Sequence, residues 1–371
     1  MHLKNIILML ILFFTFLLHP VLADDNNVLP SQTGIVNSVH YVDMENEAVQ
    51  TKQVAEVKLL TGEFKGENLV LENVLTGNPY YDIKLKKGVK VILHAEDNGN
   101  GVEYSIEDIK RSGTLVWLSL IFCGLLIYVG KRKGVYSLIS IILTVVLILN
   151  ILRPLILFGV NPIFATLLIC IASTAVTMYL VGGFNAKSTA ASLGAILSLC
   201  FATVLSLITM YTAHLSGFAN ENSMFLYSAH PELNIAAIAV SMIVLATLGA
   251  VMDVAMSIAS TINEIYLTDN TKSVKDLFIS GMNVGRDIIG TMANTLILVY
   301  LGGALSLVLL SGNIDIQKFI NLNQVVTEVA SALIGSIAIV ICVPFTALVA
   351  SMLIHFHAKK AEQEKLPWEN Y

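Results

Sequence analysis

Charged residues are scarce in this chain of 371 residues, at 13% of the sequence against 55% hydrophobic residues. A soluble globular protein carries about 25% charged residues, so this composition excludes a soluble enzyme. The net charge of −5 also gives no electrostatic basis for binding nucleic acid. Mean hydropathy is +0.74, and we therefore expect a protein whose main partner is membrane lipid.

Cysteine is also scarce, with four residues in the whole chain. All four, Cys123, Cys170, Cys200 and Cys342, lie within apolar runs, where cysteine behaves as a small buried hydrophobic residue. The polar segment between residues 24 and 112 has none, which excludes a disulfide in that segment. We expect neither a bound cofactor nor redox chemistry.

Catalytic and nucleotide-binding motifs are missing as well. The sequence has no GxxxxGK[ST] phosphate loop, so any energy source is an ion gradient or a separate subunit. The apolar runs have no GxGD, Ser-Lys or HExxH arrangement, and His355 and His357 lie at the end of a run without a nearby carboxylate. The chain is therefore not expected to be an enzyme, and no catalytic residue is assigned.

The first 23 residues have the features of a signal peptide. Lys4 precedes an apolar run from Ile6 to Leu18, and small residues end in Ala23 before two aspartates. The run is shorter than the roughly 20 residues of a membrane span. An uncleaved anchor helix is the alternative, and either one would carry the following segment across the membrane.

Residues 24–112 are predicted to form a small extracytoplasmic β domain. Apolar β-forming residues mix with polar residues at short period in five segments, and Gly and Asn mark the turns between them. The segments are residues 34–42, 54–60, 68–75, 88–94 and 102–109. Five short strands favour a closed or half-closed barrel, since closure hides the strand edges. Its His40 and His94 lack a nucleophile partner, which favours a structural or partner-docking role.

The rest of the chain predicts an α-helical polytopic membrane bundle. Residues 113–358 contain seven apolar runs, most of them long enough to cross about 30 Å of hydrocarbon as helices. The runs are Leu115–Val129, Val135–Leu152, Pro162–Val181, Thr189–Tyr211, Asn234–Ser260, Ile288–Leu310 and Val329–Phe356. A tail of residues 359–371 follows.

The distribution of Lys and Arg predicts the orientation of this bundle in the cell membrane. With the β domain outside, the inner segments hold Lys131, Arg132, Lys133, Lys187, Lys272, Lys275, Arg286, Lys359, Lys360 and Lys365. The outer segments hold only Arg153 and Lys318. This excess agrees with the positive-inside rule and makes the tail cytoplasmic.

Two of the runs carry polar residues at helical spacing. On the fifth, Asp253, Ser257, Ser260 and Glu264 recur every three or four residues. On the sixth, Asp287, Thr291 and Asn294 do the same, next to Arg286. Because consecutive spans are antiparallel, these two polar faces are expected to meet in the cytoplasmic half of the membrane.

Ionisable residues at membrane depth are costly and often functional. Our hypothesis is that Asp253 or Asp287 takes up and releases a proton or cation, with Arg286 setting its charge state. The alternative is that Arg286 and Glu264 anchor the helices at the interface, while Asp253 and Asn294 hydrogen-bond neighbouring helices.

Two of the segments between the apolar runs also carry predictions. The loop between the fourth and fifth runs holds His214, Glu221, His230 and Glu232, a weak candidate metal site whose spacing fits no standard motif and which helix-end polar residues explain equally well. Between the fifth and sixth runs, apolar residues from Val274 to Met282 predict a short amphipathic helix on the inner membrane surface. Ser273 and Asp276 are spaced as a capping box.

Two stretches carry a resemblance to a known family. They are Gly-Ala-Val-Met-Asp-Val-Ala-Met-Ser-Ile-Ala-Ser at 249–260 and Ser-Gly-Met-Asn-Val-Gly-Arg-Asp-Ile-Ile-Gly-Thr-Met-Ala-Asn-Thr-Leu-Ile-Leu-Val-Tyr at 280–300. From about Leu115 onward the chain resembles the YibE/F family of multipass bacterial membrane proteins. The resemblance implies an integral membrane protein with an exported amino-terminal region, and it implies no catalytic residue.

The placement of Asp253 and Glu264 is also faintly similar to the proton-driven SecD/SecF-like proteins, although the connector after this run lacks the Arg-rich segment expected there. Two functions follow as hypotheses. The first is a transporter or transport-coupled protein with a protonatable intramembrane site. The second is a non-transporting scaffold or sensor whose exported β domain binds a protein partner or a second copy of the chain.

Overall fold

The computed structural model describes residues 30–46, 49–97 and 102–365. The predicted signal peptide or anchor of residues 1–23 lies outside them. The chain divides into two compact units, Met1–Leu125 and Leu126–Tyr371.

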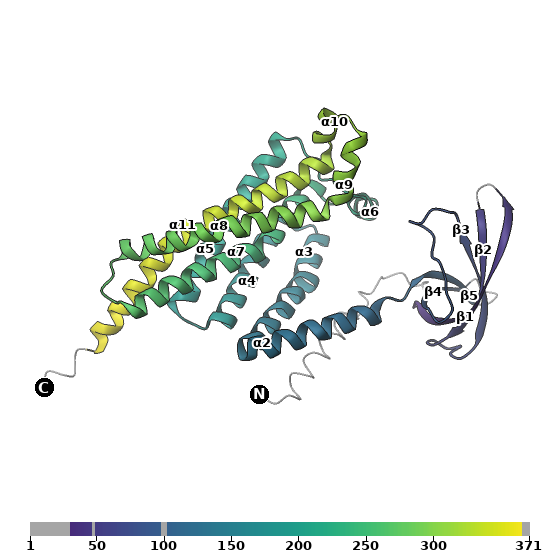
Figure 1. Cartoon of the computed structure of the whole chain (residues 1–371), viewed down its shortest axis with the longest axis horizontal. Helices are drawn as coiled ribbons and strands as arrows, with labels where there is room; N and C mark the ends of the chain where they lie inside the picture. Colours follow the sequence, from purple (N-terminus) through teal and green to yellow (C-terminus); the bar gives the residue numbers. More distant parts are fainter. Residues whose placement is uncertain (1–29, 47–48, 98–101, 366–371) are drawn as a thin grey trace. The chain divides into compact units, whose positions relative to one another are not determined.

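The first unit contains a five-stranded antiparallel sheet (Figure 1). Its strands are β1 Gln32–Asn46, β2 Val49–Leu59, β3 Asn68–Leu75, β4 Lys90–Asp97 and β5 Val102–Ile109. The order in the sheet is β3-β2-β1-β4-β5, and the two edge strands β3 and β5 also contact each other. The sheet is thus a nearly closed barrel, and the predicted β domain is confirmed.

A buried amide fixes the long loop between β3 and β4. Gln53 is fully buried, and its Oε1 accepts hydrogen bonds from Asn73 Nδ2 at 2.9 Å and from the backbone N–H of Leu85 at 3.1 Å. Its Nε2 donates to the carbonyl oxygen of Leu85 at 3.3 Å. Asn73 also donates to the carbonyl of Ile83 at 2.6 Å. Because both polar side-chain atoms of the buried Gln53 are paired, the loop is held against the sheet without a disulfide.

The same loop begins with a turn organised by Asp82. One carboxylate oxygen accepts from the N–H and the hydroxyl of Thr76, at 2.7 and 2.9 Å, and the other accepts from the N–H of Gly77 at 2.9 Å. Partial removal from water raises the pKa of Asp82, but the hydrogen bonds from Thr76 and Gly77 lower it further, so its pKa lies below the ordinary value.

We expect this turn to lose order in acid. A carboxylate with a lowered pKa stabilises the folded state above its unfolded pKa, and this stabilisation is lost as pH falls through the folded pKa. The protection factors for amide hydrogen exchange at Thr76 and Gly77 in the full chain should therefore be high at pH 5 and fall below about pH 4. Asp82→Asn should exchange fast at both pH values, whereas equal protection in the variant and the wild type would contradict this role.

The second unit is a bundle of long helices (Figure 1). The helical elements of the chain are α2 Ser112–Leu147, η1 Ile148–Leu152, α3 Arg153–Leu157, α4 Pro162–Gly182, α5 Ala186–Thr212, α6 Glu221–Ala229, α7 Ile235–Thr268, α8 Val274–Gly303, α9 Leu305–Leu310, η2 Ser311–Asn313, α10 Ile316–Ile320 and α11 Asn323–Lys365. Within the described residues, six helical stretches are long and apolar enough to cross a membrane. The predicted helical membrane bundle is confirmed.

The first of these stretches, Ser112–Leu157, covers the first two predicted runs. It is broken at Lys131, whose φ of 50° and ψ of −127° lie outside the helical region. The chain turns back tightly here. The backbone at Gly134 lies so close to the carbonyl oxygen of Leu126 that an added Cβ would collide with it. The break therefore falls where the sequence predicts the loop between two spans.

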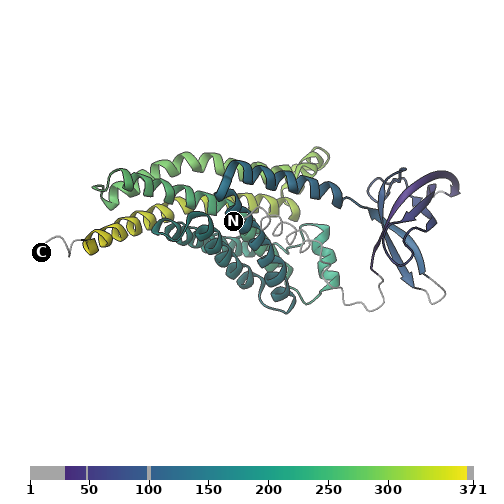
Figure 2. The same cartoon turned by 90° about the horizontal axis from the view of Figure 1, so that it is seen from below.

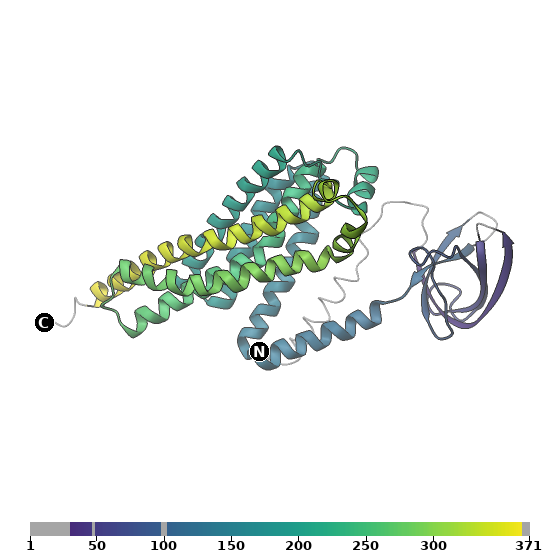
Figure 3. The ribbon, with the colours of Figure 1, turned by 45° about the horizontal axis from the view of Figure 1, so that its top comes forward.

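Close helix contact holds the bundle together. α11 packs against α5, α7 and α8, and α7 also contacts α4, α5 and α8, an arrangement visible from two further directions in Figures 2 and 3. Glycines allow these contacts: a Cβ at Gly285 would collide with Val343, and one at Gly194 would lie 2.8 Å from the Cα of Thr346. Without a hydrophobic force between helices in lipid, such packing supplies much of the stability.

One sequence prediction is wrong. The segment from Val274 to Met282 is not a separate helix on the membrane surface but the first turns of α8, which continues to Gly303. Leu277 is fully buried, because this segment packs into the bundle core. The predicted capping box is present: the Ser273 hydroxyl accepts from the N–H of Asp276, and a carboxylate oxygen of Asp276 accepts from the N–H of Ser273, both at 3.2 Å.

Replacing Gly194 by alanine should destabilise the bundle. The new Cβ meets the backbone of Thr346, which cannot rotate away, and overpacking of this kind costs about 1–3 kcal/mol. Gly290→Ala is the matched control, since nothing lies within 4 Å of its added Cβ. We expect the thermal unfolding midpoint of purified protein to fall only for Gly194→Ala. Equal midpoints for the two variants would contradict the close α5–α11 contact.

Candidate functional site

The polar residues predicted on the fifth run share one exposed face of α7. Asp253, Ser257 and Glu264 are exposed, while the intervening Val254 and Ile258 are buried in the bundle core. The same face continues toward the start of the helix through exposed Met242, Ala246 and Gly249. We call the line of residues 242, 246, 249, 253, 257 and 264 the α7 stripe. It follows the helical period along most of α7.

The polar residues predicted on the sixth run are also exposed, on α8. They are Arg286, Asp287, Thr291 and Asn294. The guanidinium of Arg286 donates from Nη1 to Oδ1 of Asn283 at 2.9 Å. Among the described residues, no ion pair or hydrogen bond joins Arg286 to Asp253 or Asp287. The structure therefore places these residues on neighbouring helices without bringing their charged groups into contact.

Helix contacts give the depth of these residues. α4 has 21 residues, or about 31 Å, which matches the hydrocarbon thickness. Its last residue, Gly182, lies beside Met256 of α7, since an added Cβ would be 2.9 Å from the Met256 Cε. Asp253 is thus about one turn inside the level where α4 ends. Glu264 is about two turns beyond it.

The same reckoning applies to α8. A Cβ at Gly281 would lie 2.6 Å from Cδ1 of Ile262, so these two residues are at one level. Six residues along each antiparallel helix bring Asp287 beside Met256, at the end of α4. Arg286 and Asp287 therefore lie at the level where α4 ends, which favours the anchor interpretation for them and for Glu264. Asp253, Thr291 and Asn294 lie inside it.

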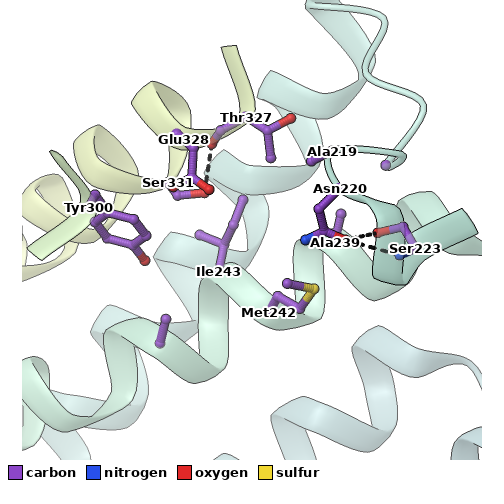
Figure 4. A pocket seen from close by; sticks show the side chains of 12 residues that line it. Ala219, Asn220, Ser223, Ala239, Met242, Ile243, Tyr300, Thr327, Glu328 and Ser331 are labelled. Atoms are coloured by element: carbon purple, nitrogen blue, oxygen red, sulfur yellow. Dashed lines mark hydrogen bonds between the residues drawn. The ribbon is translucent and has the colours of Figure 1, made fainter. Parts of the chain in front are cut away.

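A second acidic residue occupies the opposite end of the bundle. Glu328 of α11 is partly buried and lines a cavity of about 120 Å³ (Figure 4). The cavity is lined by Gly217, Ala219, Asn220, Ser223, Ala239, Met242, Ile243, Ala246, Tyr300, Thr327, Glu328 and Ser331. Asn220 Oδ1 accepts from the N–H and the hydroxyl of Ser223, both at 3.0 Å, and the Ser331 hydroxyl donates to the carbonyl of Thr327 at 2.7 Å.

The carboxylate of Glu328 takes no part in these hydrogen bonds. Within the part of the chain that the structure describes, it forms no ion pair and no hydrogen bond. The sequence analysis does not predict it, because the seventh apolar run begins at Val329, one residue later. An acidic residue followed directly by an apolar run was the available signal. The helix begins at Asn323, which places Glu328 more than one turn inside it.

The α7 stripe meets this cavity. Met242 and Ala246 belong to the stripe and also line the cavity with Glu328. Gly249 and Asp253 continue the same exposed face toward the other end of the bundle. Glu328 and Asp253 therefore lie at opposite ends of one line of residues formed by Met242, Ala246 and Gly249.

The histidine-containing loop includes an ion pair. His230 Nδ1 lies 3.1 Å from Oε1 of Glu232, and the pKa of Glu232 is lowered by its own backbone N–H and by the His230 ring. His214 has a positive φ of 51° and does not join them. Across the described ranges, no group of three or more His, Cys, Asp or Glu side chains is arranged to hold a metal ion.

Comparison with known families covers most of the chain. A family model described as YibE/F-like protein matches residues 118–356, and a second, described as the YibE/F family N-terminal domain, matches residues 32–109. No curated protein and no solved structure matches the chain.

Labelling of single cysteines should reveal whether the α7 stripe is in contact with water. In a protein with its four native cysteines replaced by alanine, Asp253→Cys and Ser257→Cys should react with a membrane-impermeant maleimide at least about tenfold faster than Val254→Cys. The reason is that the first two positions are exposed and the third is buried. Equal, slow reaction at all three positions would mean that the stripe faces lipid, against this prediction.

Proposed function

The chain belongs to the YibE/F family, and from that membership and its apolar helices we propose an integral membrane protein that acts as a transporter or a transport-coupled protein. Its intramembrane carboxylates, Asp253 and Glu328, bind and release a proton or a cation. The family descriptions name no substrate, so the proposal rests on the chemistry of these two residues.

The observation that carries the proposal is the continuity between the Glu328 cavity and the α7 stripe. Lipid offers no hydrogen-bond partner, and an unpaired carboxylate in hydrocarbon is costly. A carboxylate that faces a cavity lined by hydroxyl and amide groups avoids this cost when it binds a proton or a cation. Glu328 has such surroundings, with Thr327, Ser331 and Asn220 in the cavity wall. Small residues along the stripe leave room for water between the two carboxylates.

The orientation proposed from the sequence gives each carboxylate a side. Arg153 begins α3 and Lys318 lies in α10, near the end of the bundle that holds the Glu328 cavity. Lys187 is the second residue of α5, and Lys272 and Lys275 flank the start of α8, at the other end. By the positive-inside rule, Glu328 faces the exterior and Asp253 the cytoplasm. The β domain is then extracytoplasmic and the carboxyl tail cytoplasmic.

The second candidate function is a scaffold or sensor whose β domain binds a protein partner. It is favoured by large aromatic side chains on the surface of that domain, with Tyr41, Tyr80 and Tyr81 exposed by 64%, 73% and 70%. Aromatic residues are enriched in protein interfaces. If the chain without residues 30–110 keeps its full cellular activity, this candidate is excluded.

Neutralising either carboxylate should strongly reduce proton movement. In proteoliposomes that contain a pH-sensitive dye, we expect Asp253→Asn and Glu328→Gln each to lower the protein-dependent proton flux under an imposed membrane potential by at least about tenfold, equivalent to about 1.4 kcal/mol. Glu264→Gln is the matched control, because Glu264 lies beyond the membrane edge, and its flux should stay within about twofold of wild type. Wild-type flux in both of the first two variants would exclude a coupling role for these carboxylates.

A further inference from the structure

A second hollow adjoins the Glu328 cavity. It is a groove of about 330 Å³ between α8 and α11, bounded at one end by α9 and α10. Its walls include Ile297, Leu301, Leu307, Phe319, Val329 and Leu333. Tyr300 and Glu328 are the two residues in its lining that carry polar side-chain groups, and both also line the polar cavity. Tyr300 and Glu328 therefore form a wall that the two hollows share.

The groove is open on the lipid-facing side of the bundle. Leu301 of α8 is 49% exposed, and Val329 and Leu333 of α11 are both 52% exposed. A molecule dissolved in the membrane can enter it sideways without crossing the polar cavity. Its volume is at the low end of the roughly 300–1,000 Å³ of small-molecule sites, which favours one alkyl chain over two.

The two residues of this shared wall determine the charge of the occupant. Glu328 has no cationic partner among the described residues, so it would repel an anionic head group and attract a cationic one. The adjacent ring of Tyr300 attracts an ammonium group through its π-electron face. The apolar walls gain about 25 cal/mol for each Å² covered by an alkyl chain.

We propose that the two hollows together bind a single-chain cationic amphiphile, with its ammonium group at Glu328 and Tyr300 and its alkyl chain in the groove between α8 and α11. This inference rests on the proposed function, because it takes Glu328 to be the charged group of the transport path. It adds the class of compound that this path accepts. Binding is measured separately from proton flux, so either proposal can fail without the other.

A photoreactive dodecylammonium probe, with a diazirine on its chain, tests this site in full-length protein in lipid nanodiscs. We expect saturable labelling of the α8 and α11 segments that line the groove, mapped by mass spectrometry and prevented by dodecyltrimethylammonium but not by dodecyl sulfate. Glu328→Gln should raise the half-saturating concentration at least about tenfold, while the matched Glu264→Gln leaves it unchanged.

A second pair of variants tests the alkyl-chain site without altering charge. Leu301→Trp fills the groove, whereas Leu298→Trp adds the same side chain to an exposed position of α8 outside its lining. Only the first should reduce labelling, by at least about tenfold at subsaturating probe. Labelling spread evenly over all exposed helices, or unchanged in both Glu328→Gln and Leu301→Trp, overturns the proposal. The proposal is also overturned if labelling is lost in phosphatidylethanolamine nanodiscs but kept in phosphatidylglycerol nanodiscs. In that case bulk lipid occupies the groove.

Discussion

Lipid supplies no hydrogen-bond partners, and most of the bundle can be understood as a response to that constraint. The buried polar residues are chiefly serines and threonines. Many of them, including Ser198, Thr203 and Ser206, donate to the carbonyl oxygen four residues earlier in their own helix. Because these hydroxyls are paired within one helix, neighbouring helices can approach closely at Gly194, Gly281 and Gly285. The ionised carboxylates of Asp253 and Glu328 cannot donate a hydrogen bond to a carbonyl oxygen of their own helix in this way.

Patterns that are local in sequence predicted structure well. The five alternating segments became the five strands, because side chains alternate across a strand. The positions of Asp253, Ser257 and Glu264 on one face of α7 followed from the helical period. The Ser273–Asp276 capping box was readable because it involves only four consecutive residues. Each of these features depends on neighbours in the chain and not on tertiary packing.

Features that depend on packing could not be read in this way. The sequence does not show that α8 begins at Val274, because its amphipathic first turns also suit a surface helix; burial of Leu277 against the bundle decides between them. The depth of Arg286 and Asp287 follows from the contact between Gly281 and Ile262. Glu328 was missed because an apolar run, taken alone, does not show how far the helix extends before it. α11 begins at Asn323, six residues before the start of the predicted run at Val329.

The separation of the two carboxylates limits how they can work together. From Ala246, in the cavity wall, to Asp253 is seven residues of α7, or about 10 Å, too far for direct proton transfer between side chains. Exchange between the two ends therefore requires either water along the stripe or movement of one helix against another. α7 contacts α4, α5, α8 and α11, so it is held on several sides. α8 is the least buried of the six candidate spans in the described residues, and it carries Tyr300, which lines both hollows beside Glu328. A displacement of α8 would alter the Glu328 surroundings while leaving Asp253 on α7 in place, and the packing thus makes α8 the element through which occupancy of one end can affect the other.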